Sequence, residues 1–366
     1  MQTRLKTETI SPPRTWAEIN LSALKHNLSF VRQHSEQQVM AVLKAGAYGH
    51  GIEQIAKALD SEHLAYFGVA SVIEARKLKN AKIQTPIYLL GPTFPEERQE
   101  IVEQRWVASI STLEEAQHFN SLNRGCEKLV VHITFDTGMG RGGFLPSALH
   151  SAIDQIQALP NLHLAGIGSH LPSADEDREF TLRQFSQFES AVSNCKLEYL
   201  HLSNSAGLLD YQSKVTNLVR PGLMLYGISP IARYQELLQP VMQLKSRVSL
   251  VRTLPAGHGI SYGRETILKQ DTRVATIGAG YGDGLPRALS GNNAEVLIRG
   301  KRCPLLGRVT MDQIMVDVSK LPVCEPGDEV ELFGKQILVS EIAKKARMIP
   351  WEVLTGITPR VTRIYQ

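Results

Sequence analysis

Short apolar segments alternate with amphipathic segments over the first two-thirds of the chain, and this pattern constrains the fold more than any other feature. Nearly continuous apolar runs are typical of strands buried on both faces of a parallel sheet. Eight such units over about 200 residues fit a closed (β/α)8 TIM barrel better than an open sheet. The runs are VMAVL (39–43), YFGVA (66–70), PIYLLG (86–91), WVASI (106–110), KLVVHITFD (128–136), LAGIGSH (164–170), YLHLS (199–203) and LVRPGLMLYG (218–227).

The pattern changes near residue 241. Beyond it, segments of alternating apolar and polar residues are separated by Gly, Pro and Asn, as in antiparallel strands joined by turns. Only SEIAKKARM (340–348) and WEVLTG (351–356) have the spacing of helices. We therefore expect an α/β barrel over residues 14–241, followed by a mostly antiparallel β domain over residues 242–366.

The charge of the chain is nearly balanced. Its 40 Lys and Arg residues against 36 Asp and Glu give a net charge of +4, without a block of five like charges. This is too weak and too dispersed for binding nucleic acid or an anionic membrane. The first residues, MQTRLKTETISPPRT, have no apolar segment of a secretory signal, and no apolar run approaches the roughly 20 residues that span a bilayer.

The cysteines are far apart and none belongs to a CxxC pair, so they indicate neither a disulfide framework nor a zinc site. We expect four reduced thiols, no bound metal and a cytoplasmic protein. The four are Cys126, Cys195, Cys303 and Cys324.

A lysine follows the first apolar run and is itself followed by a turn rich in glycine, in VMAVLKAGAYGHG (39–51). The C-terminal ends of barrel strands are where catalytic residues gather. Burial there disfavours the ammonium form of Lys44, lowers its pKa and frees an amine that can attack an aldehyde. On Lys44 alone, a lysine that reaches solvent from a strand end is the commoner explanation.

The segment GMGRGG (138–143) matches the G-x-G-x-x-G pattern of dinucleotide-binding loops. That pattern requires a helix directly after the loop, and here FLPSA follows, with a proline where the helix should run. We therefore reject a nucleotide site. The glycines instead allow a sharp bend that projects Arg141 into the barrel mouth.

Eight motifs in the same order resemble those of alanine racemases. The resemblance spans residues 39 to 318 and implies a barrel that binds pyridoxal phosphate (PLP), a β domain, and a head-to-tail homodimer. The motifs are AVLKAGAYGHG, FDTGMGRGG, SHLPSAD, LHLSNSAG, VRPGLMLYG, ISYGRET, GYGDGLPRAL and GRVTMDQIMVDV.

The resemblance assigns the cofactor site residue by residue. Lys44 would hold PLP covalently, His170 would pack near the pyridine ring, and Arg220 would donate to the pyridine nitrogen. An arginine keeps its proton, so that nitrogen should stay unprotonated. The phosphate would lie against Tyr48, Ser205 and the backbone N–H groups of Gly222 and Leu223, with Asn204 beside them.

The resemblance also implies a two-base mechanism on an amino-acid substrate. Lys44 would exchange the proton of the D-isomer and Tyr262 of the other subunit that of the L-isomer. Arg141 would bind the substrate carboxylate, assisted by the backbone N–H of the partner's Met311. The expected activity is interconversion of L-alanine and D-alanine, which supplies D-alanine for peptidoglycan.

Three positions depart from the common pattern of the family. Gly46 stands where Asn is usual, and Thr134 stands where many members have a lysine that orients the arginine at position 141. Pro359 replaces a tyrosine that contacts the phosphate. The last change leaves open a serine racemase or one of broader specificity.

Two further alternatives come from proteins that share the barrel. A non-catalytic PLP carrier would lack the β domain and the tyrosine, and this chain has both. A decarboxylase would be expected to place an acidic residue, not Arg220, at the pyridine nitrogen.

Overall fold

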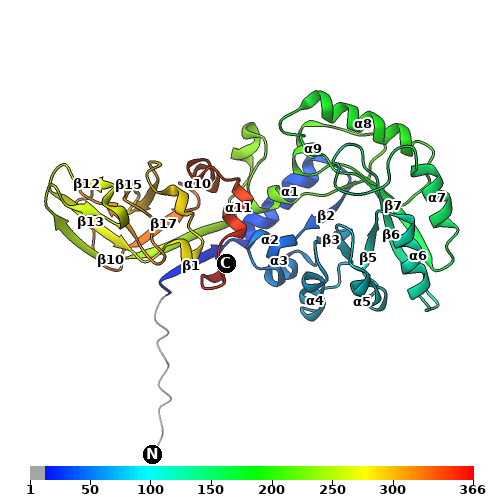
Figure 1. Cartoon of the computed structure of the whole chain (residues 1–366), viewed down its shortest axis with the longest axis horizontal. Coiled ribbons are helices and arrows are strands. Elements are labelled where there is room, and N and C mark those ends of the chain that lie inside the picture. The colour runs from blue at the N-terminus through cyan, green and yellow to red at the C-terminus, as the bar shows by residue number, and fades with distance from the viewer. Residues whose placement is uncertain (1–12) are drawn as a thin grey trace, which may run out of the picture. The chain divides into compact units, whose positions relative to one another are not determined.

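The structure is a computed structural model that describes residues 13–366. These form two compact units: Asn20–Val241, and Met242–Gln366 together with the described residues up to Ile19. Figure 1 shows both. Most of the N-terminal segment that we expect to lack a secretory signal lies outside the described residues.

The first unit is built on eight parallel strands in the order β8-β7-β6-β5-β4-β3-β2-β9. Backbone hydrogen bonds from Asn217 N to Leu200 O (3.0 Å) and from Arg220 N to Ser203 O (3.0 Å) join the two ends of this order, so the sheet closes into a barrel. The predicted α/β barrel is therefore confirmed. The strands are β2 (Gln38–Val42), β3 (Tyr66–Val69), β4 (Ile87–Leu89), β5 (Val107–Ile110), β6 (Leu129–Thr134), β7 (Leu162–Gly168), β8 (Tyr199–His201) and β9 (Leu218–Val219).

The eighth strand is much shorter than the apolar run that predicts it. Of residues 218–227 only Leu218–Val219 form β9, and a 3-10 helix, η2 (Leu223–Tyr226), soon follows. Pro221 has no N–H to give to a strand ladder, so regular pairing ends there.

Helices surround the strand ring (Figure 1). Several begin at a side chain that accepts a backbone N–H: Asn20 caps α1, Ser71 caps α4, Thr112 caps α6 and Asp177 caps α8. Such caps stabilise a helix start by about 1 kcal/mol each. The helices of this unit are α1 (Leu21–His34), α2 (Lys44–Tyr48), α3 (Ile52–Leu59), α4 (Val72–Asn80), η1 (Pro95–Glu97), α5 (Arg98–Gln104), α6 (Leu113–Leu122), α7 (Leu149–Gln157), α8 (Arg178–Val192), α9 (Ser205–Asp210), η2 and η3 (Ala232–Leu237).

The second unit is a mostly antiparallel sheet in the order β13-β16-β15-β14-β17-β10-β1-β18, with β10 also pairing with β13. β11 and β12 pair with each other as a separate two-stranded sheet. The strands are β1 (Thr15–Ile19), β10 (Met242–Leu254), β11 (Gly259–Ile260), β12 (Thr266–Ile267), β13 (Thr272–Ile277), β14 (Glu295–Ile298), β15 (Lys301–Leu306), β16 (Ile314–Asp317), β17 (Glu329–Phe333) and β18 (Thr362–Tyr365). Its helices are η4 (Tyr262–Arg264), η5 (Tyr281–Asp283), η6 (Arg287–Leu289), α10 (Val339–Ala346) and α11 (Pro350–Thr355).

The boundary expected at residue 14 needs a correction. β1 pairs antiparallel with β10 and parallel with β18, so residues 15–19 belong to the β sheet and not to the barrel. These pairings join segments far apart in the chain, which no local pattern reveals.

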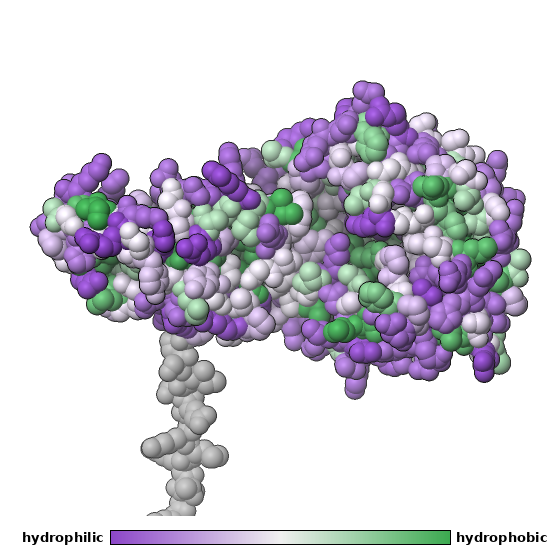
Figure 2. Space-filling model, viewed as in Figure 1, coloured by the Kyte–Doolittle hydropathy of each residue, from purple (hydrophilic) through white to green (hydrophobic). Residues whose placement is uncertain are grey.

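In the described part of the chain, no helix is long and apolar enough to cross a bilayer. Those residues also contain no group of three or more His, Cys, Asp and Glu side chains arranged to hold a metal ion. On the face drawn in Figure 2, hydrophobic residues lie in small groups among hydrophilic ones.

The barrel interior is mainly apolar, and Met40, Tyr66, Tyr88, Val107 and Leu218 form one buried cluster from five strands. Two histidines are buried with them, and glycines of β7 make room for both. A Cβ on Gly166 would lie 2.6 Å from His132 Nδ1, and a Cβ on Gly168 would lie 2.0 Å from His201 Cε1.

We expect Gly168→Ala to lower the free energy of unfolding by about 1–3 kcal/mol, because the methyl group collides with the fixed His201 ring. Urea unfolding measures the change. Gly91→Ala is the matched control, since a Cβ there meets no atom within 4 Å. Equal stability of the two variants would contradict the packing described.

Candidate active site

The turn after β2 carries Lys44 and has an unusual backbone. Ala45, Gly46, Ala47 and Tyr48 have φ values of 53°, 64°, 56° and 51°, so α2 is a left-handed turn. Left-handed conformation costs roughly 1–2 kcal/mol for each residue with a Cβ. Ala45, Ala47 and Tyr48 all carry a Cβ, so contacts with the surrounding structure must stabilise the turn in this conformation.

A carboxylate from another helix holds this turn. Glu74, on α4, accepts the N–H of Gly46 at 3.1 Å through Oε1 and that of Ala70 at 2.9 Å through Oε2. It therefore ties the turn after β2 to the chain after β3. The sequence analysis missed Glu74, which has the appearance of an ordinary charged residue in the first turn of a helix.

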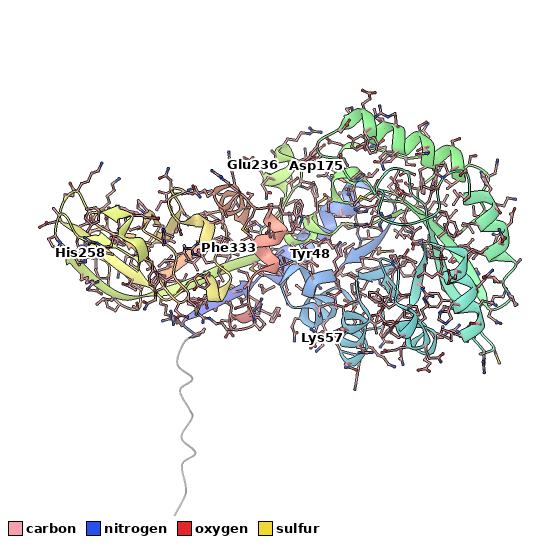
Figure 3. All side chains as sticks on the ribbon, in the orientation of Figure 1. Tyr48, Lys57, Asp175, Glu236, His258 and Phe333 are labelled. Atoms are coloured by element: carbon pink, nitrogen blue, oxygen red, sulfur yellow. The ribbon has the colours of Figure 1, made fainter. Side chains whose placement is uncertain are left out.

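Tilted aromatic rings in contact support the other side of the turn. The Tyr226 ring centroid lies 4.8 Å from that of Tyr48 and 4.6 Å from that of His50. The Tyr226 hydroxyl donates to Val42 O at 3.0 Å, at the end of β2. Figure 3 labels Tyr48 at this turn and, by contrast, the exposed Lys57 on α3. Strand end and turn thus form one packed block that fixes the position of Lys44.

The environment of Lys44 disfavours its charge. Burial lowers the pKa of the Lys44 amine, the cations Arg141 and Arg220 lower it further, and Glu74 opposes them. The direction of this shift, predicted from the strand-end position, is confirmed. The amine is thereby more available as a nucleophile and a base near neutral pH.

Hydroxyl and amide groups converge where α9 and η2 begin. Ser205 Oγ accepts the N–H of Gly222 at 3.1 Å and that of Met224 at 3.4 Å, so its own proton remains available for an acceptor. A Cβ on Gly222 would lie 2.4 Å from the Tyr48 hydroxyl oxygen, so glycine is needed at this position. Leu223 begins η2 directly after it. Burial raises the pKa of Tyr48 to about 12, which keeps its hydroxyl protonated as a donor.

Asn204 positions this group of donors. Its Oδ1 accepts Gly207 N at 3.0 Å, which caps α9, and its Nδ2 donates to Leu171 O at 3.0 Å, beyond β7. Both ends of the amide are therefore used to join the loops after β7 and β8.

Arg220 lies buried at the end of β9, with 7% of its surface exposed. It donates to Ser169 O, to Leu202 O at 3.3 Å and to His201 Nδ1, and His170 Nδ1 lies 3.4 Å away. Burial and the nearby Arg141 lower the pKa of Arg220 to about 10, with Tyr88 acting in the opposite sense. The guanidinium is therefore still charged at neutral pH.

A chain of hydrogen bonds continues from Arg220 into the barrel. His201 Nε2 lies 3.0 Å from His132 Nδ1, and His132 Nε2 lies 3.5 Å from the Tyr66 hydroxyl. The sequence analysis missed both histidines. Their positions inside strands gave no signal, since a strand histidine has the same local pattern whether it faces the barrel axis or the helices.

The three histidines near Arg220 are neutral. Burial first, and then Arg220, lower the pKa of both His132 and His170 to about 3, and lower that of His201 well below its ordinary value. Arg141 and Lys44 add to the effect on His170.

The loop that carries Arg141 is organised by its own aspartate. Asp136 accepts the N–H groups of Gly138, Met139 and Gly140 at 2.8 to 3.2 Å. The next helix, α7, begins only at Leu149. The GMGRGG segment is thus a capped bend and not the start of a helix, as the proline in the following FLPSA predicts.

The remaining two expected site residues, Tyr262 and Met311, belong to the β unit. Both are exposed, at 71% and 52%. Ser261, directly before Tyr262, has φ 64° and ψ −173°, a backbone region nearly restricted to glycine, and its hydroxyl donates to Arg308 O at 2.8 Å. Gly282 N donates to Met311 O at 2.8 Å, which fixes the Met311 backbone.

Comparison with known proteins identifies the family. Residues 19–230 match the model of the alanine racemase N-terminal domain, and residues 241–365 match that of the C-terminal domain. The chain belongs to the alanine racemase family. An alanine racemase from Methylacidiphilum infernorum is 38% identical over 361 residues, covering 97% of this chain and 93% of that protein.

Solved structures of alanine racemases have the same fold. That from Clostridium difficile 630 matches with a TM-score of 0.91 and 35% identity, covering 97% of this chain and 96% of that one. The structure from Bartonella henselae, which has covalently bound pyridoxal phosphate, matches with a TM-score of 0.90 and 28% identity, over 97% and 100% of the two chains. Pyridoxal phosphate is the cofactor of this family.

The residues of the barrel mouth fit this cofactor. The Ser205 and Tyr48 hydroxyls, each with a proton to donate, suit a phosphate, and the amine of Lys44 suits an aldehyde. Arg141 lies close enough to lower the pKa of both Lys44 and Arg220, Arg220 also lowers that of Lys44, and Glu74 is the one carboxylate among the described residues that raises it noticeably. Such a cationic site favours a dianionic group.

We expect stability to fall as the pH drops from about 6.5 towards 3. Histidines with lowered pKa stay neutral in the folded chain while the unfolded chain binds protons, so each contributes about 2 kcal/mol of lost stability between pH 7 and pH 5. In His132→Gln, the free energy of unfolding should fall less between pH 7 and pH 5 than in the wild type, and the difference should be about 2 kcal/mol. His150→Gln, at an exposed site on α7, is the control. Urea unfolding at both pH values tests this, and equal pH dependence of the two variants would contradict it.

Proposed function

We propose that this chain racemises alanine with pyridoxal phosphate, interconverting the L- and D-isomers and supplying D-alanine for peptidoglycan. The observation that carries the proposal is the Lys44 amine, of lowered pKa, fixed on a left-handed turn beside Arg141 and Arg220. The hydroxyl and amide donors of the barrel mouth supply the place for a phosphate.

When bound, the cofactor would supply an electron-withdrawing group that acidifies the Cα proton of the substrate. Tyr48, Ser205 and the N–H groups of Gly222 and Leu223 would hold its phosphate. Lys44 would be its covalent anchor and, as a free amine, a base next to Cα. Arg141 binds the substrate carboxylate, as a guanidinium does through two parallel hydrogen bonds.

Arg220 would donate to the pyridine nitrogen and His170 would pack near the ring. The guanidinium has five N–H groups, and among the described residues it has four acceptors: Ser169 O, Leu202 O, His201 Nδ1 and His170 Nδ1. Three of these acceptors share the two N–H groups of Nη2 and one lies at Nη1, so the second N–H of Nη1 and that of Nε have no acceptor among the described residues and could serve the ring nitrogen. With a pKa of about 10, Arg220 keeps its proton at neutral pH and leaves that nitrogen unprotonated.

Inversion requires proton exchange on both faces of Cα, and one base cannot serve both. Lys44 serves the D-isomer. Tyr262 of a second copy of the chain serves the L-isomer, and the backbone N–H of the partner's Met311 assists Arg141. The proposed enzyme is therefore a homodimer with two composite sites. Its four unpaired cysteine thiols support a cytoplasmic location.

We expect Lys44→Ala to lose the visible absorbance of bound pyridoxal phosphate and at least about 10³-fold of its alanine racemisation, because anchor and base are removed together. Polarimetry with L-alanine and with L-serine measures the activity and its breadth. Lys57→Ala, at the exposed lysine on α3, is the matched control. Retained absorbance in Lys44→Ala would contradict the cofactor assignment. A wild-type protein that inverts neither L-alanine nor L-serine would refute the proposed activity.

We expect Tyr262→Phe to lose racemisation while still exchanging the Cα proton of D-alanine with deuterium, since Lys44 alone serves that isomer. Proton NMR in deuterium oxide measures exchange from each isomer. Mixing the inactive Lys44→Ala and Tyr262→Phe proteins should restore up to about a quarter of the activity: half of the dimers are hybrids, each with one of two sites intact. If subunits exchange and no activity returns, the composite site is wrong.

A further inference from the structure

The position of Arg141 needs an explanation in this chain. Thr134, where many members of the family have a lysine, carries no charge, and its methyl packs beneath the loop: a Cβ on Gly143 would lie 2.9 Å from Thr134 Cγ2. Two charged groups whose pKa Arg141 lowers, Lys44 and Arg220, are themselves cations and repel it. The loop must therefore be held by contacts other than an ion pair from position 134.

Gln184, on α8, makes such contacts. Its side chain is 1% exposed, and its Nε2 donates to Thr137 Oγ1 at 3.1 Å and to His170 O at 3.2 Å. Thr137 begins the bend that leads to Arg141, and His170 follows β7. One amide group thus joins the loop expected to bind the substrate carboxylate to the loop expected to lie beside the cofactor ring.

The orientation of this amide is fixed by chemistry. His170 O is a carbonyl and can only accept, so the NH₂ end of Gln184 must face it. The other end, Oε1, is buried without a partner in the described part of the chain. An unpaired buried carbonyl is unfavourable, so the position is held at a cost to stability, as is common at functional sites.

The contact continues towards Arg220. Thr137 Oγ1 lies 2.8 Å from Ser169 Oγ, and the carbonyl of Ser169 accepts from Arg220. One turn earlier on α8, Phe180 lies against the backbone of the bend, since a Cβ on Gly138 would be 2.7 Å from Phe180 Cζ. α8 therefore contacts the loop through the Phe180 ring and forms hydrogen bonds with it through the Gln184 amide.

We infer that Gln184 is a positioning residue, which sets the Arg141 loop in register with His170 and thereby determines the affinity of the site for a carboxylate. The inference rests on the proposed function for the role of Arg141. It assigns to α8 the positioning of Arg141, which the uncharged Thr134 cannot provide.

Gln184→Met tests the inference, because methionine keeps the length of the side chain and removes the donor. In the holoenzyme we expect the KM for both alanine isomers to rise about tenfold, because both hydrogen bonds of the Gln184 amide are lost, while kcat changes less than threefold. The dissociation constant of propionate, a carboxylate without an amine, should rise by the same factor in calorimetry. The visible absorbance of the cofactor should not change.

Gln187→Met is the matched control, at an exposed glutamine on the same helix. Thr137→Val should reproduce the defect and Thr137→Ser should not, which keeps the test decisive if Gln184→Met does not fold. Unchanged propionate affinity in Gln184→Met and in Thr137→Val would overturn the inference, as would a wild-type protein that does not bind propionate. Propionate affinity lost in both variants, with a wild type that inverts no alanine, would support the positioning role and refute the activity.

Discussion

The charge of Arg220, buried at the end of β9, determines the state of every group around it. A guanidinium does not give up its proton, so its bond to His201 Nδ1 requires the His201 proton to be on Nε2. His201 then donates to His132 Nδ1, and His132 donates from Nε2 towards Tyr66. One fixed charge thus sets two tautomers and orients a line of side chains across the barrel interior, and burial first, with Arg220 second, keeps both imidazoles neutral. Glycines on β7 provide the space that these rings require.

The alternation of apolar and amphipathic segments was sufficient to predict the barrel, and with it the grouping of Lys44, Arg141, His170 and Arg220 at one mouth, because each follows a strand. The features that sequence did not reveal depend on pairs distant in the chain. β1 joins the sheet of the second unit through β10 and β18. Glu74 acts on a turn that precedes it by a whole helix and strand. Gln184 looks like one more polar residue of an amphipathic helix, and only its burial separates it from Gln187.

Both residues proposed to move protons adjoin backbone that a residue with a Cβ adopts at a cost. Lys44 precedes the left-handed residues 45–48, and Ser261, with φ 64°, precedes Tyr262. In each case a nearby contact compensates: Glu74 holds the first turn, and the hydroxyl of Ser261 bonds to Arg308 O. Such conformations persist only where the surroundings over-determine them, and they are concentrated at functional sites. The unfavourable backbone conformation lowers stability at these two places, and it fixes the direction of the Lys44 and Tyr262 side chains.

The same backbone explains why Gly46 can replace the asparagine usual in the family. With φ 64°, this position lies in the left-handed region, where Gly is favoured and Asn is tolerated better than most residues with a Cβ. A Cβ at Gly46 would meet no atom within 4 Å, so the site does not select by size. Its N–H, which any residue other than proline supplies, is the group that Glu74 binds. The position therefore selects for conformation, and the exchange of Asn for Gly preserves the turn that presents Lys44.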